Sequence, residues 1–125
     1  MYKGSVVVSL FENGKENIRV QLIDCDNAPK DMKKQLPIVC SLLRMIPGID
    51  RPDYWLAKCE RPLKDKKTII NYLIIAPRLV GEQIKKGMGS IGINVAYVID
   101  ETLLQDSTLN FDKCKPVAIC TSEEF

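Results

Sequence analysis

The acidic residues of the stretch LIDCDNA are the first candidates for chemistry in this sequence. Asp24 and Asp26 come at the end of an apolar, strand-like segment, and Asp100 follows another one. Carboxylate oxygens can hold Mg²⁺, and one carboxylate can attack phosphorus while a second transfers the proton of the leaving group. These three residues define one hypothesis, a magnesium-dependent phosphoryl-transfer enzyme.

The same stretch resembles, over a few residues, the opening motif of phosphatases of the haloacid dehalogenase type. That motif also places two aspartates at the end of a strand, but Ala28 stands where it has a hydroxyl residue. An Asn-Gly turn before the strand also makes it antiparallel to its predecessor, whereas the family has a parallel sheet. We therefore do not assign the family. In the simpler interpretation, Asp24, Asp26 and Asn27 leave a strand and cap the helix that follows.

The stretch GMGSIG, at 87–92, has the G-x-G-x-x-G spacing of loops that hold the phosphates of a dinucleotide. Such a loop must follow a strand and begin a helix, because the amides at the helix N-terminus then face the pyrophosphate. Here a helix-like segment precedes the glycines and the β-rich INVAYVI follows them. This order favours a turn, with Gly87 at positive φ at the end of a helix.

The composition excludes several kinds of site. The chain has no histidine, so it has no Ser-His-Asp triad, no Cys-His pair and no H-E-x-x-H zinc site. The odd number of cysteines, the absence of C-x-x-C and the absence of an export signal indicate reduced, buried thiols in a cytoplasmic protein. We therefore expect no disulfide, no metal and no cofactor. The cysteines are Cys25, Cys40, Cys59, Cys114 and Cys120.

Size and charge indicate a single globular domain over 1–125. The chain has 125 residues, of which 46% are hydrophobic, and a formal net charge of +2. This charge is too small to indicate a nucleic-acid partner, and no apolar run is long enough to span a bilayer. Weak nucleic-acid binding remains a third hypothesis, which requires several lysine groups to meet on one face. The groups are Lys30, Lys33 and Lys34; Lys64, Lys66 and Lys67; Lys85 and Lys86; and Lys113 and Lys115.

Hydrophobic patterning predicts an α+β fold with the element order β-β-α-β-β-α-β-β. We expect a largely antiparallel or mixed sheet of five to six strands, covered by helices on one face. Asn13-Gly14 is a strong hairpin signal between the first two strands. The strands are expected at 4–12, 17–24, 53–63, 68–76, 93–100 and 115–121.

Two helices are expected beside this sheet. The longer one spans 26–48, where apolar residues recur at spacings of four and three, and Pro37 should kink or divide it. The shorter one spans 77–87, with Pro77 in its first turn and Gly87 at its end. The apolar stripe of the longer helix consists of Met32, Leu36, Val39, Leu43 and Ile46.

The long connection at 101–114 is too apolar for a solvated loop, because it contains Leu103, Leu104, Leu109 and Phe111. These residues either pack on the sheet as a satellite cluster or form a contact surface for another chain. Trp55 is a further candidate anchor, since it and the preceding tyrosine should point to opposite faces of a strand. The main hypothesis is a small cytoplasmic domain that acts by protein–protein binding or self-association through this segment and a face or edge of the sheet.

Overall fold

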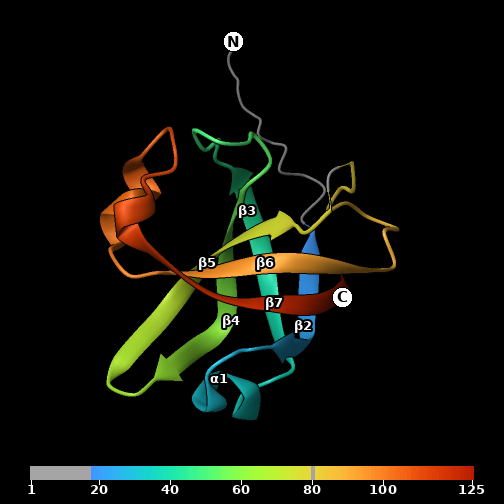
Figure 1. Ribbon diagram of the computed structural model, residues 1–125, viewed down its shortest axis with the longest axis vertical. Coiled ribbons are helices and arrows are strands. Elements are labelled where there is room, and N and C mark those ends of the chain that lie inside the picture. The colour runs from blue at the N-terminus through green and yellow to red at the C-terminus, as the bar shows by residue number, and fades with distance from the viewer. Residues whose placement is uncertain (1–17, 80) are drawn as a thin grey trace.

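The protein folds as a closed barrel of six antiparallel strands in a computed structural model that describes residues 18–79 and 81–125 (Figure 1). Each strand pairs with the next one along the chain, and the last pairs with the first. Closure therefore leaves none of these six strands with an unpaired edge. The strands are β2 (Arg19–Asp26), β3 (Ile38–Met45), β4 (Trp55–Asp65), β5 (Thr68–Pro77), β6 (Ser90–Val98) and β7 (Cys114–Glu124).

Helical structure in the described residues is limited to three short pieces. The helix α1 (Lys30–Lys34) lies between β2 and β3, at the lower end of the barrel in Figure 1. The 3₁₀ helices η1 (Glu101–Gln105) and η2 (Phe111–Lys113) lie together on one side of it, between β6 and β7. None of these helices is long and apolar enough to cross a membrane. The expected α+β fold with one long kinked helix and one short helix is therefore wrong.

The segment expected as the long helix, 26–48, forms a short helix followed by a strand. The helix α1 ends at Lys34, and a cis peptide bond precedes Pro37 just before β3 begins. In β3, Ile38, Cys40 and Leu42 alternate into the interior of the barrel. The pattern misled because a strand that is apolar on both faces also contains apolar residues three and four positions apart. Pro37 in addition removes a backbone donor that a continuous helix needs.

The prediction of a second helix at 77–87 is also wrong, because residues 81–89 form turns and irregular backbone. Gly81 and Gly87 have φ angles of +95° and +78°, which an α-helix does not contain. The positive φ expected at Gly87 is confirmed, but it belongs to a loop and not to a helix end. This loop leads into β6, and Gly92 lies within that strand, so no helix follows the glycines.

The strands were predicted better than the helices. Five expected strands correspond to β2, β4, β5, β6 and β7, and every strand pair in the ring is antiparallel. The strand expected at 4–12 and the turn at Asn13-Gly14 lie outside the described residues. The sheet is not covered by helices on one face, because it closes on itself and buries its inner face.

Successive side chains of a strand point alternately into and out of the barrel, and the apolar ones form two clusters, an inner and an outer one. The inner cluster fills the barrel and includes Leu22, Leu73 and Tyr97. The outer cluster lies outside the barrel wall, between β4, β5 and β6 and the residues of 101–114. Its buried members are Ile46, Leu56, Ile74, Val98, Leu103 and Leu109. The segment 101–114 is therefore packed against the outer face of the barrel.

A disulfide joins Cys25 of β2 to Cys120 of β7, at the seam where the barrel closes. The two residues are opposite each other in the register, with their Cα atoms 3.9 Å apart. The expectation of no disulfide is therefore wrong. The residues are 95 positions apart in the sequence, and only closure of the barrel brings them together.

Candidate functional site

The structure does not bring together the three aspartates of the phosphoryl-transfer hypothesis. Asp24 and Asp26 are exposed on β2. Asp100 instead caps η1, where its carboxylate accepts hydrogen bonds from the backbone N–H and the hydroxyl of Thr102. These hydrogen bonds lower the pKa of Asp100. No three Cys, Asp or Glu side chains among the described residues are grouped so that they could hold a metal ion.

Hydrogen bonds place two of the four lysine groups side by side. The side chain of Gln35, which follows α1, donates to the carbonyl of Lys64 at 2.7 Å and accepts from its N–H at 2.8 Å. The N–H of Lys66 donates to Asp31 on α1. The helix α1 and the β4–β5 hairpin, which carry these two lysine groups, therefore lie together at the lower end of the barrel (Figure 1). These contacts join two groups, fewer than the several that the nucleic-acid hypothesis requires.

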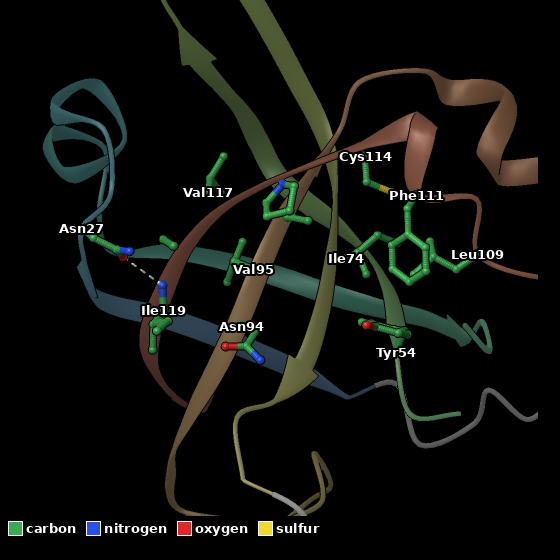
Figure 2. Close-up of a pocket in the computed structure, with 13 residues that line it drawn as sticks. Asn27, Tyr54, Ile74, Asn94, Val95, Leu109, Phe111, Cys114, Val117 and Ile119 are labelled. Carbon is green, nitrogen blue, oxygen red and sulfur yellow. Dashed lines mark hydrogen bonds between the residues drawn. The ribbon is translucent and has the colours of Figure 1, made fainter. Parts of the chain in front are cut away.

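An apolar hollow of about 440 Å³ lies on the outside of the barrel (Figure 2). Its floor includes Ile74 of β5, Ala96 of β6 and Pro116 of β7, which are partners in the register and form one row across the three strands. Leu109 and Phe111 form its wall on the side of η2. We call this hollow, with these floor and wall residues, the outer groove.

Tyr54 and Phe111 form the aromatic end of the outer groove. Their ring centroids are 5.8 Å apart and the rings meet edge to face. A Cβ added at Gly48 would lie 2.6 Å from the ring of Tyr54, so the ring occupies space that only glycine leaves free. The hydroxyl of Tyr54 donates to Asp50 at 2.8 Å. Burial, followed by this hydrogen bond, raises the pKa of Tyr54 to about 12.

Backbone and side-chain hydrogen bonds fix the wall of the groove. The guanidinium of Arg44 donates to the backbone carbonyl of Asp106 at 2.6 Å. The carboxylate of Asp106 pairs with the ammonium of Lys113 at 2.8 Å. The N–H of Leu109 donates to the carbonyl of Pro47 at 2.8 Å. Because these contacts lie within the protein itself, the wall is formed before any ligand binds.

The opposite end of the groove carries two side-chain amides. Asn27 follows β2, and its carbonyl oxygen accepts a hydrogen bond from the N–H of Ile119 on β7, shown as a dashed line in Figure 2. Asn94 of β6 is exposed at the rim. The helix cap expected from Asp24, Asp26 or Asn27 is not formed, since Pro29 precedes α1 without a side-chain hydrogen bond. An apolar floor with few polar groups is typical of sites that bind by burying apolar surface.

The candidate contact residues occupy three different positions. Leu109 and Phe111 line the outer groove, whereas Leu103 is fully buried and Leu104 is partly buried in the outer cluster. Trp55 packs against the inner cluster and lines a separate hollow. Sequence reasoning missed the floor of the groove, because its residues come from three strands and share a row only after the barrel has formed.

A second hollow adjoins the outer groove. Leu109 and Phe111 line both, and Ile49 and Asp112 line the second one only. The side chain of Phe111 therefore lies between two hollows. The side chain of Phe111 is 44% exposed and that of Ile49 is 96% exposed. Exposed apolar side chains thus extend from the groove onto the surrounding surface.

No family model, no curated protein and no solved structure matches this chain. The barrel architecture by itself indicates no activity, since one architecture serves many functions. The function must therefore be inferred from the outer groove and the surface around it.

Proposed function

We propose that the protein is a binding domain whose outer groove receives apolar side chains of a partner polypeptide. The position of Phe111 between two hollows carries this proposal. Single exposed apolar residues are common on protein surfaces, but here they adjoin a preformed apolar hollow. This combination is typical of interaction sites.

The shape of the surface favours a polypeptide over a small molecule. Two hollows separated by one side chain can accept two side chains that project from the same partner backbone. A small ligand enclosed in the outer groove would leave Ile49 in water, whereas a polypeptide that crosses Phe111 would cover it. The six described strands form a closed ring, so the partner cannot add a strand to an edge among them. Side-chain burial must therefore supply most of the affinity.

The charge beside the second hollow indicates the chemistry of the partner. Asp112 lines that hollow. Asp50 directly follows Ile49, which also lines it, and the Asp50 carboxylate accepts the hydrogen bond from Tyr54. Neither carboxylate forms an ion pair with another described residue. A lysine or arginine beside the apolar side chains of the partner would meet these charges. The proposed partner segment therefore carries two apolar side chains and one adjacent basic residue.

Selection of random peptides displayed on phage, followed by fluorescence anisotropy with the selected peptides, tests this proposal. We expect selected peptides to share two apolar residues and a Lys or Arg, and Phe111→Asp to weaken their binding at least about tenfold. Phe125→Asp is the matched control, because Phe125 is also exposed but stacks on Arg19 and does not line the groove.

Two results would overturn the proposal. Selected peptides that bind wild type and Phe111→Asp equally would show that they use another surface. A wild-type dimer that Phe111→Asp converts to a monomer, as measured by light scattering, would identify a second copy of this chain as the occupant in place of a separate partner.

A further inference from the structure

Two more cysteines face each other inside the barrel. Cys40 of β3 is the direct register partner of Cys59 of β4, and the side chains are only 0% and 4% exposed. Residues opposite each other in an antiparallel pair have Cα atoms about 4.5 to 5.5 Å apart and side chains on the same face. This separation lies within the range of about 4.4 to 6.8 Å that is usual for the Cα atoms of a disulfide.

The two side chains face each other in the inner cluster. A side-chain hydrogen bond with Cys59, followed by burial, raises the pKa of Cys40 well above its usual range. Both thiols are free, as is that of Cys114. Because no third Cys, Asp or Glu in the described part of the chain joins them in a metal-binding group, the pair stands as a dithiol.

The barrel already contains one oxidised pair of the same kind. Cys25 and Cys120 are likewise opposite residues on neighbouring antiparallel strands, and they form a disulfide. Both pairs belong to the inner cluster. Two strand junctions of the same ring, β7–β2 and β3–β4, therefore each carry facing cysteines, and they differ in oxidation state.

We infer that Cys40 and Cys59 form a two-electron redox site that a small-molecule disulfide, such as oxidised glutathione, converts to a second cross-strand disulfide. The thiolate of one cysteine attacks a sulfur of the oxidant, which forms a mixed disulfide and releases one glutathione. The other cysteine then attacks the mixed disulfide and releases the second glutathione. The protein loses two electrons and two protons, and the oxidant becomes two thiols.

Burial makes this oxidation depend on local opening of the barrel. Buried, protonated thiols react slowly, so β3 and β4 must separate transiently to admit the oxidant. The register between these strands shifts between Leu42 and Arg44, close to Cys40, which interrupts their hydrogen-bonded ladder. The product links β3 to β4 covalently and restricts the unfolded chain, so the oxidised protein should melt at a higher temperature.

Equilibration of the native protein in glutathione redox buffers tests this inference. After an acid quench, the protein is denatured, alkylated at its free thiols and measured by mass spectrometry. In mildly reducing buffers that preserve the Cys25–Cys120 bond, we expect three alkylated cysteines per molecule. In oxidising buffers we expect only one, Cys114. Proteolysis should release a peptide pair linked through Cys40 and Cys59, and the oxidised form should show a higher melting temperature.

The wild-type protein itself supplies the decisive result, and variants add controls. Cys114→Ala should leave the yield of the second disulfide unchanged, whereas Cys59→Ala should abolish it. Three alkylated thiols at every glutathione ratio would overturn the inference. Linkage of Cys40 or Cys59 to Cys114, or to a second molecule, would overturn it as well. The outcome is independent of whether the outer groove binds a peptide.

Discussion

Cys25 and Cys120 lie opposite each other where β2 meets β7, and the bond between their sulfurs closes the barrel covalently. In a barrel whose strands pair in chain order, this junction joins the residues that are farthest apart in the sequence. A link between distant residues removes the most conformational freedom from the unfolded chain. The covalent bond therefore lies at the strand junction whose formation restricts the chain most.

Loss of the Cys25–Cys120 bond should destabilise the protein strongly. We expect Cys25→Ala combined with Cys120→Ala to lower the free energy of unfolding by about 2 to 5 kcal/mol, the usual range for a native disulfide. Urea denaturation measures the change, and wild type under a thiol reductant should show a similar loss. Cys114→Ala removes a thiol that is free and half-buried, and it should have a much smaller effect. Equal stability of the double variant and wild type would contradict the structural role of this bond.

The strands could be predicted from the sequence because their amino-acid composition distinguishes them from helices. Stretches such as 68–76 and 93–100 are rich in β-branched and aromatic residues and are apolar on both faces, as buried strands require. The sequence did not predict β3, because Ile38, Cys40 and Leu42 belong to a short apolar run whose spacing also fits a helix. It did not predict closure of the ring, because closure depends on pairing between β2 and β7, which lie far apart in the sequence.

The candidate site was predictable only in part. The apolar content of 101–114 identified Leu109 and Phe111, which line the outer groove. Leu103 has the same sequence signal but is fully buried, because spacing within an irregular segment does not show which side chains face the barrel. The aspartates and glycines matched short motifs, but their positions in the fold do not match the corresponding sites.

Tyr97→Phe should stabilise the protein. Tyr97 is 1% exposed in the inner cluster, and its hydroxyl has no hydrogen-bond partner among the described residues. Replacement by phenylalanine keeps the ring and removes a buried, unsatisfied polar group, which should raise the free energy of unfolding by about 1 kcal/mol. Urea denaturation at neutral pH measures the change. A loss of stability would contradict this prediction, because it would show that the hydroxyl interacts favourably in the folded state.

Tyr97→Phe should also change how the stability of the protein depends on pH in the alkaline range. Burial raises the pKa of Tyr97 to about 12, whereas a free tyrosine has a pKa of about 10. The folded state therefore binds the hydroxyl proton more tightly than the unfolded state does. The stabilisation that results is complete below about pH 10 and is lost as the pH rises towards 12. Tyr97→Phe should lose less stability than wild type across this interval. If the free energy of unfolding falls equally with pH in the two proteins, the raised pKa of Tyr97 is contradicted.

Gly48→Ala should weaken peptide binding at the outer groove. The added Cβ would lie 2.6 Å from the ring of Tyr54 and 2.9 Å from the carboxylate of Asp50, so the ring must move away from its position beside Phe111. We expect peptide affinity to fall several-fold and the free energy of unfolding to fall by about 1 to 3 kcal/mol, as for other overpacked sites. Fluorescence anisotropy and urea denaturation measure the two effects. Unchanged affinity would show that Tyr54 does not shape the binding site.

Gly87→Ala should lower stability through backbone strain and not through loss of a ligand site. Gly87 has a φ of +78°, and no atom lies within 4 Å of an added Cβ, so the change alters only the backbone preference. A residue with a Cβ at positive φ costs about 1 kcal/mol or more. Gly92→Ala is the matched control, because Gly92 lies in β6 and its added Cβ would be 3.6 Å from Arg78, an ordinary contact distance.

Thermal unfolding of both variants and of wild type, with and without millimolar NAD or ATP, separates the two roles of GMGSIG. We expect Gly87→Ala to melt several degrees lower, Gly92→Ala to melt close to wild type, and neither nucleotide to change these values. The loop leads into β6 and not into a helix, so it does not present helix N-terminal amides to a phosphate. If a nucleotide raises the melting temperature of wild type and Gly87→Ala abolishes only that gain, the glycines form a phosphate-binding loop and the turn interpretation is wrong.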